Sequence, residues 1–222
     1  MTDHAAFIRA NTALTQPPLT PEIRLHLATE IVPIWKSTEE ELAAQGVPPP
    51  FWAFAWAGGQ ALARYILDNP ELVRGKIVLD FAAGSGIASV AAMKAGAASA
   101  TGVEIDDYSV AAIALNAEAN DVAVEGIKQD LVGLDCGWEV VLAGDVCYER
   151  EMAARVFAWL SALARRGALV LVGDPGRNYL PKNDLEALQS YEVQTTRELE
   201  DREIRRTTVY RVCAGVRAAG PT

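Results

Sequence analysis

The chain has 222 residues, half of them hydrophobic, which is enough to bury one core but short for two full domains. Asp and Glu total 29 against 20 for Lys and Arg, and the net charge of −9 argues against nucleic acid as the main partner. No apolar run reaches the roughly 18 residues of a membrane span, and the first ten residues lack the pattern of a signal peptide. Three cysteines without CxxC spacing predict neither a disulfide framework nor a metal site. We therefore expect a soluble, cytoplasmic, metal-free protein, and we expect it to be a monomer.

The first part of the chain, residues 1–50, is predicted to be an appendage packed on a main domain. The alternation of apolar and polar residues over 23–27 is typical of a half-buried strand. Ser37 and Glu40 have the spacing of a capping box, which predicts a short helix over 38–44. Three consecutive prolines then end regular structure before an aromatic segment.

From residue 51 onward, apolar strands alternate with helices. Helices are predicted over 59–69, 87–95, 109–120 and 149–164, and strands over 77–79, 100–105, around Ile127, 140–143 and 168–172. This alternation predicts an α/β domain over 51–213, with a doubly wound, mostly parallel sheet covered by helices on both faces. Two β-rich segments, 191–199 and 204–213, are joined by too few residues for a crossover helix. They predict an antiparallel hairpin at the sheet edge, followed by a flexible tail over 214–222.

The strongest local pattern is VLDFAAGSGIAS at residues 78–89. It combines an apolar strand, an acid at its end, a loop of small residues and the start of a helix. Ala82, Ala83, Gly84 and Gly86 allow a ligand to approach the backbone closely, and the helix N-terminus offers free N–H groups. The alternative is a tight strand-to-helix turn that binds nothing.

Glu104 ends the next strand, where the two oxygens of an acid can accept both hydroxyls of a ribose. Together, Glu104 and the loop predict a nucleoside-binding sheet. A dinucleotide fingerprint would have a third glycine where this chain has Ser89, and Asp80 stands just before the loop. A carboxylate there would repel a pyrophosphate but suits a ligand that carries an amino group and a sulfonium. The pattern therefore favours S-adenosylmethionine.

Several motifs resemble those of known methyltransferases. The D-x-A-x-G-x-G pattern at 80–86, Glu104 and DVCY at 145–148 are similar to the seven-β-strand methyltransferases, and D-x-x-Y to protein-lysine methyltransferase family 16. More narrowly, FWAFAWAGGQALARYILDNPELVRGK at 51–76 and GDPGR at 173–177 resemble the electron transfer flavoprotein β-subunit lysine methyltransferases. The resemblance covers roughly residues 20–212. It implies a Rossmann-like sheet of seven strands and methyl transfer from S-adenosylmethionine to lysines of the flavoprotein β subunit.

The resemblance also implies individual cofactor contacts. Trp56 is expected to lie against the cofactor, Glu104 at its ribose and Asp130 beside its adenine. Ala82 replaces the commonest glycine of the family, and its added methyl group should be tolerable if φ stays negative. With Asp80, the predicted cofactor residues are Trp56, Asp80, Ala82, Ala83, Gly84, Gly86, Glu104, Asp130 and Gly144.

Asp145 and Tyr148 are predicted to be the catalytic residues at the substrate entrance. Methyl transfer requires a neutral amine aligned with the sulfur–methyl bond. Asp145 would attract a lysine ammonium, and desolvation against the Tyr148 ring and the sulfonium would favour loss of its proton. In the alternative interpretation, Asp145 caps the helix that starts at Glu149 and Tyr148 packs in the core. The segment 173–177 is either a local turn or a substrate-facing loop.

Other functions stay open from the sequence. Relatives that methylate nucleobases carry Pro-Pro where this chain has Val146 and Cys147, which favours a lysine substrate. A methyltransferase that modifies a ribosomal protein would use the same chemistry. The alternatives outside this class are an NAD-dependent oxidoreductase and a non-catalytic binding module.

Overall fold

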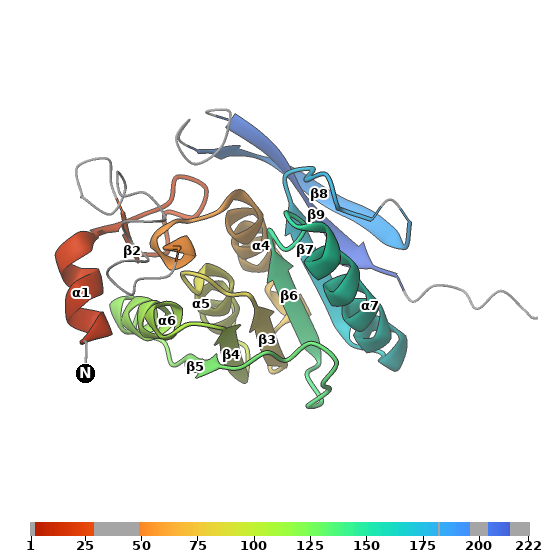
Figure 1. Ribbon diagram of the computed structural model, residues 1–222, viewed down its shortest axis with the longest axis horizontal. Helices are drawn as coiled ribbons and strands as arrows, with labels where there is room; N and C mark the ends of the chain where they lie inside the picture. The colour runs from red at the N-terminus through yellow and green to blue at the C-terminus, as the bar shows by residue number, and fades with distance from the viewer. Residues whose placement is uncertain (1–2, 29–48, 182, 196–203, 214–222) are drawn as a thin grey trace, which may run out of the picture.

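The computed structural model describes residues 3–28, 49–181, 183–195 and 204–213. Its centre is a seven-stranded sheet in the order β5-β4-β3-β6-β7-β9-β8 (Figure 1). The strands are β3 (Ile77–Phe81), β4 (Ser99–Glu104), β5 (Glu125–Lys128), β6 (Val140–Gly144), β7 (Leu169–Asp174), β8 (Leu185–Gln194) and β9 (Ile204–Val212). Strands β3 to β7 are parallel, whereas β9 pairs antiparallel with both β7 and β8. The predicted fold class is confirmed.

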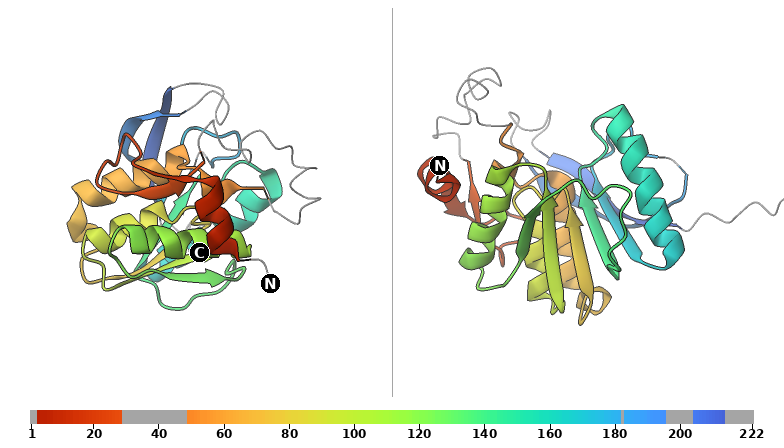
Figure 2. Two further views of the ribbon diagram at one scale, coloured as in Figure 1. Left: turned by 90° about the vertical axis from the view of Figure 1, so that its left-hand side faces the viewer. Right: turned by 60° about the horizontal axis from the view of Figure 1, so that its bottom comes forward.

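Helices cover both faces of this sheet because its central strands are apolar on both sides. The main helices are α4 (Ala57–Asp68), α5 (Ile87–Lys94), α6 (Asp107–Ala119) and α7 (Arg150–Arg166). Successive residues of β6 point to opposite faces: Leu142 packs in the cluster that contains Leu62 of α4, and Val141 in the cluster that contains Leu160 of α7. Figure 2 shows α7 on the side of the sheet opposite to α4 and α5.

The N-terminal residues form a small unit against α6. It consists of α1 (His4–Asn11), β1 (Ala13–Thr15) and β2 (Leu25–Leu27), with β1 and β2 paired antiparallel. Ile8 is fully buried, and the rings of His4 and Phe7 lie 4.4 and 5.2 Å from the Tyr108 ring. The sequence did not predict α1, because a helix this short depends on packing rather than on propensity.

Two predictions for the N-terminal region have different outcomes. The strand predicted over 23–27 is present but shorter, as β2. Asn116 of α6 accepts a hydrogen bond from the N–H of His26, and Asn120 exchanges two with the backbone of Arg24. The helix predicted over 38–44 lies outside the described residues, and the domain boundaries stay predictions.

The C-terminal hairpin is confirmed, but the predicted start of its first strand is wrong. Strand β8 begins at Leu185 rather than at 191, and Leu185 pairs with Val212 of β9. The residues that open β8, LEALQS, have low strand propensity, so pairing with β9 overrides their local preference. The tail predicted over 214–222 lies outside the described residues.

The topology identifies one edge of the sheet for ligand binding. Because β3, β4, β6 and β7 are parallel, their carboxyl ends meet at one edge. The chain order reverses at β3, whose neighbours are β4 and β6. Ligands of such sheets bind at this switch point, outside the carboxyl ends of the strands. Among the described helices, none is both long and apolar enough to cross a membrane.

Candidate functional site

A cleft opens at the switch point between β3 and β6. It is bounded by the loop after β3, the end of β6 and the segment that leads into α4. Its lining residues are Phe54, Trp56, Gly59, Asp80, Ala82, Ala83, Gly84, Ser85, Ile87, Ala88, Gly144 and Asp145. The structure therefore brings together most of the residues that the sequence predicted for the cofactor.

The loop after β3 has the backbone conformation that small residues permit. Gly84 and Gly86 have φ of 54° and 75°, and Gly86 is the N-cap residue of α5. Ala82 has a φ of 52°, so the condition of a negative φ, under which its methyl group should be tolerable, is not met. An alanine in the left-handed region costs about 1 kcal/mol, and such strain is typical of loops that bind ligands.

Asp80 lies at the base of the cleft and is buried. Its Oδ2 atom accepts hydrogen bonds from the backbone N–H and the hydroxyl of Ser89, both at 2.8 Å. Burial raises the pKa of Asp80 to about 6, although both hydrogen bonds lower it. Ser89 therefore has a clear role in place of the third glycine of a dinucleotide fingerprint, since its side chain fixes this acid.

Glu104 connects the end of β4 to the same loop. Its Oε1 accepts a hydrogen bond from the Gly84 N–H at 2.7 Å, and its Oε2 accepts one from the Ile105 N–H at 3.1 Å. Burial raises the pKa of Glu104 to about 7. The carboxyl group is thus held beside the loop, as a ribose-binding acid would be.

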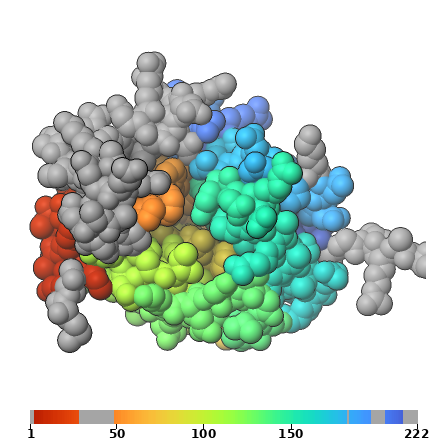
Figure 3. Space-filling view, in the orientation of Figure 1, coloured from red at the N-terminus to blue at the C-terminus, as the bar shows by residue number. Residues whose placement is uncertain are grey.

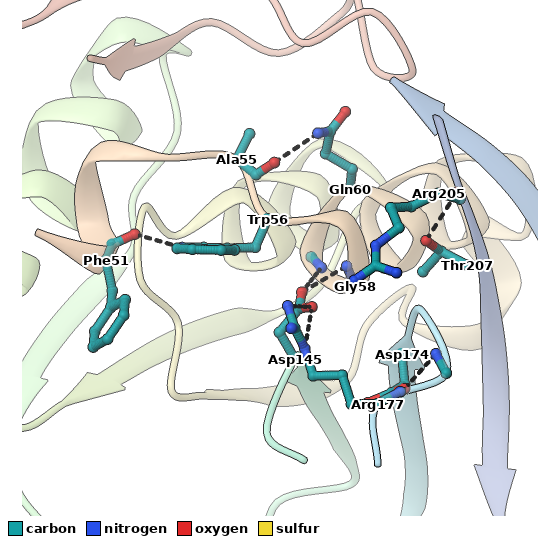
Figure 4. A network of polar contacts seen from close by, with 12 residues as sticks. Phe51, Ala55, Trp56, Gly58, Gln60, Asp145, Asp174, Arg177, Arg205 and Thr207 are labelled. Atoms are coloured by element: carbon teal, nitrogen blue, oxygen red, sulfur yellow. Dashed lines mark hydrogen bonds and ion pairs between the residues drawn. The ribbon is translucent and has the colours of Figure 1, made fainter. Parts of the chain in front are cut away.

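Asp145 joins three parts of the structure (Figure 4). Its side chain is mostly buried and its φ is 58°. The Oδ2 atom accepts hydrogen bonds from the N–H groups of Gly58 and Gly59, at 2.6 and 3.3 Å, at the start of α4. The Oδ1 atom accepts hydrogen bonds from Nη2 and Nε of Arg177, at 2.7 and 3.2 Å.

The alternative roles for Asp145 and Tyr148 do not hold. Helix α7 is capped by Glu149, whose side chain accepts hydrogen bonds from its first turn, so Asp145 does not cap it. Tyr148 is 55% exposed and is not part of the core. Its ring lies 6.2 Å from that of Phe51, and the surfaces of these two segments, orange and teal, adjoin in Figure 3. Partial burial raises the pKa of Tyr148.

Arg177 lies at the site but was not among the residues predicted from the sequence. Asp174 forms a turn in which its Oδ1 accepts hydrogen bonds from the N–H groups of Gly176 and Arg177, both at 2.7 Å. This turn directs the guanidinium to Asp145 and places it 6.0 Å from the Trp56 ring. The segment 173–177 is thus a local turn that also faces the cleft. The sequence contained a signal for this contact, since Asp145 and Arg177 follow two strands predicted to be parallel, whose carboxyl ends lie at the same sheet edge.

The glycines Gly58 and Gly144 allow α4 to approach the sheet edge closely. A Cβ atom on Gly58 would lie 2.5 Å from Oδ2 of Asp145 and even closer to the carbonyl oxygen of Gly173. A Cβ atom on Gly144 would lie 2.9 Å from the backbone nitrogen of Gly59. The start of α4 therefore rests directly on the ends of β6 and β7.

The remaining predicted residues differ in position. Trp56 lines the cleft, and its indole N–H donates to the carbonyl of Phe51 at 2.9 Å. Asp130 does not line it; its Oδ2 pairs with Arg155 at 2.9 Å, and the Val132 N–H and Arg155 lower its pKa. A place for Asp130 beside an adenine stays a prediction. Within the described ranges, no group of three or more His, Cys, Asp or Glu residues could hold a metal ion.

Comparisons with known proteins agree with this geometry. A family model described as ribosomal protein L11 methyltransferase (PrmA) matches residues 60–144. A solved structure of magnesium protoporphyrin IX methyltransferase from Synechocystis, with bound SAH, has a TM-score of 0.51 at 18% identity and covers 69% of this chain and 80% of its own, which shows the fold.

Sequence relatives are more specific. The electron transfer flavoprotein β subunit lysine methyltransferase of Xenopus laevis is 37% identical over 212 residues, covering 92% of this chain and 85% of the relative. The Danio rerio protein of the same name is 38% identical over 175 residues, covering 77% and 67%. The chain belongs to the electron transfer flavoprotein β-subunit lysine methyltransferase family.

Proposed function

We propose that this protein transfers methyl groups from S-adenosylmethionine to lysine side chains of an electron transfer flavoprotein β subunit. One observation carries the proposal: a single cleft at the switch point is lined by the small-residue loop and Asp145, and Glu104 accepts a hydrogen bond from that loop, in a chain of this family. The flavoprotein substrate is taken from the names of the relatives.

The residues around the cleft fit S-adenosylmethionine. The backbone of Gly84 and Gly86 is open to close approach, and the carboxylate of Glu104 is placed to accept hydrogen bonds from ribose hydroxyls. Asp80, when ionised, adds negative charge that favours a cationic ligand over a pyrophosphate. When bound, the cofactor supplies a methyl group on a positively charged sulfur. We assign Trp56, Ala82, Ala83, Gly144 and Asp130 to the same ligand.

The acceptor side of the cleft has aromatic walls. The centroid of the Phe51 ring lies 6.0 Å from that of the Trp56 ring and 6.2 Å from that of the Tyr148 ring. Aromatic walls exclude water from a lysine side chain that lies between them, and this desolvation favours the neutral amine close to the methyl donor. Asp145 lies beside these rings and fixes the start of α4, so we assign Asp145 and Tyr148 to alignment of the acceptor.

Two alternatives share parts of this site. A ribosomal protein as substrate is favoured by the family model that matches residues 60–144 and needs no other chemistry. An oxidoreductase that binds NAD would require the cleft to hold a pyrophosphate beside Asp80. The first alternative changes only the substrate, and the second changes the cofactor.

A labelling experiment tests the proposal. Labelled S-adenosylmethionine and the protein are added to a lysate of its source that lacks the protein, and labelled proteins are identified by mass spectrometry. Label on lysines of the flavoprotein β subunit supports the proposal. Label on a ribosomal protein alone would make that protein the substrate in place of the flavoprotein β subunit. Absence of label on any protein would contradict protein methylation.

A further inference from the structure

The carboxylate at the acceptor side is already occupied by groups of this chain. Asp145 receives four N–H donors, two from the start of α4 and two from Arg177. The Asp145 and Arg177 side chains are only 11% and 17% exposed, so this ion pair is mostly shielded from water. A substrate lysine therefore meets a carboxylate that is already in an ion pair rather than a free acid.

We propose that Arg177 is a positioning residue for methyl transfer, which holds Asp145 in an ion pair so that the substrate lysine reacts as a neutral amine instead of being retained as an ammonium. This inference rests on the proposed lysine methyltransferase function and adds how the acceptor is prepared.

The position of the guanidinium supports this role. It lies 6.0 Å from the ring of Trp56, on the aromatic side of the cleft where the acceptor enters. A cation at that place disfavours a second cation, and Asp145 cannot accept from an ammonium without giving up donors that it already has. The turn at Asp174 fixes the backbone of Arg177, so the guanidinium is presented in a defined direction.

The chemical step balances with the proposed cofactor. The lysine ammonium releases its proton to solvent, and the nitrogen lone pair forms a bond to the methyl carbon. The carbon–sulfur bond breaks and its electrons stay on sulfur, which gives a methylated ammonium and neutral S-adenosylhomocysteine. Arg177 takes no proton in this step and acts only through Asp145 and through its charge.

Other titratable groups surround the pair and remain in every variant. On the sheet edge and the loops these are the acids Asp80, Glu104, Glu149 and Asp174 and the uncharged side chains of Cys147 and Tyr148. Burial raises the pKa of Asp80 to about 6, that of Glu104 to about 7, and those of Cys147 and Asp174 as well. Figure 4 also shows Arg205 of β9 near the start of α4. Because these groups titrate in all variants, a change specific to Arg177 reports on the pair itself.

The test is the pH dependence of kcat, which reports groups of the enzyme–substrate complex. In R177Q, the Asp145 carboxylate no longer has the guanidinium as its counter-charge, so it attracts the lysine ammonium more strongly. We expect the acid limb of kcat to move up by about one pH unit and KM for the protein substrate to fall severalfold. R177K keeps a cation and should restore most of the wild-type profile.

D145N gives a prediction of opposite sign. Its amide oxygen still accepts from the Gly58 N–H, but Arg177 keeps its charge without the carboxylate, so the acid limb should move down and KM should rise. This variant tests the proposal even if R177Q does not fold. R150Q is the matched control, because Arg150 is an arginine at the start of α7 whose guanidinium lies over the Tyr179 ring and not on Asp145. Its acid limb should stay in place.

Failure of the inference differs from failure of the proposed function. The role of the pair is overturned if R177Q folds but loses kcat by the same factor at every pH. It is also overturned if R150Q shifts the acid limb of kcat as much as R177Q does. Both outcomes leave methyl transfer as the function. A wild-type protein that binds S-adenosylhomocysteine but methylates no protein overturns the proposed function and this inference with it.

Discussion

At the scale of single residues, the raised pKa of Glu104 makes cofactor affinity depend on pH. With a pKa of about 7 in the free protein, Glu104 is partly protonated at neutral pH. The ionised form accepts ribose hydroxyls better, so binding favours it and affinity must fall as pH decreases through this pKa. We expect the Kd for S-adenosylhomocysteine to rise by about tenfold at most per pH unit between about pH 8 and about pH 6.

Isothermal titration calorimetry at constant ionic strength measures this dependence. E104Q should bind S-adenosylhomocysteine more weakly at high pH, and its Kd should depend less on pH. The dependence that remains would come from Asp80, whose pKa is about 6. An unchanged slope in E104Q would show that another group is responsible.

Asp145 gives the second residue-scale prediction. D145A removes the acceptor of Gly58 and leaves Arg177 mostly buried without its carboxylate, at a cost of about 3 kcal/mol of folding free energy. Transfer should become undetectable while S-adenosylhomocysteine still binds, because the loop and Glu104 are unchanged. Near-normal turnover, measured with labelled cofactor, would refute the catalytic assignment of Asp145.

Residue types alone predicted the loop after β3 and its two acids, whereas Trp56, Gly144 and Asp145 came from the family resemblance. Asp80, Gly84 and Glu104 could be selected because small residues and acids at strand ends have few other reasons to occur together. The positive φ of Ala82 and the pairing of Arg177 with Asp145 could not, since both depend on how separate segments meet at the sheet edge.

At the scale of elements, the contact between α4 and the sheet edge depends on Gly58. In G58A the new methyl group would overlap the carbonyl of Gly173 and the carboxylate of Asp145, so α4 must move away. We expect a loss of about 2 kcal/mol of stability and a larger loss of methyl transfer. G75A is the control: Gly75 has a φ of 70° but open space around it, so only about 1 kcal/mol of backbone strain is added. Denaturant unfolding and activity of both variants check this, and equal activity losses would contradict it.

Elements were predictable where burial determines the pattern. The central parallel strands are apolar on both sides, and the long helices have clear ends, so both were located to within a few residues. Helix α1 and the start of β8 were missed because their structure comes from packing on Tyr108 and from pairing with β9, which local sequence does not encode.

At the scale of the whole molecule, ligand-induced stabilisation separates the cofactor classes. S-adenosylhomocysteine at about 100 times its Kd should stabilise the fold by about 2.7 kcal/mol, which corresponds to about 5–10 °C in Tm for a chain of this size. NADH should give no shift, since Asp80 disfavours a pyrophosphate in the cleft. A thermal scan with both ligands measures this, and a larger shift with NADH would favour the oxidoreductase.

The most direct test of the central claim is the intact mass of a purified electron transfer flavoprotein β subunit after incubation with this protein and S-adenosylmethionine. We predict mass increases of whole methyl groups that map to lysines, with one S-adenosylhomocysteine formed per methyl group. If the mass of the subunit stays unchanged although this protein is folded and binds S-adenosylhomocysteine, the assignment of this subunit as the substrate is contradicted.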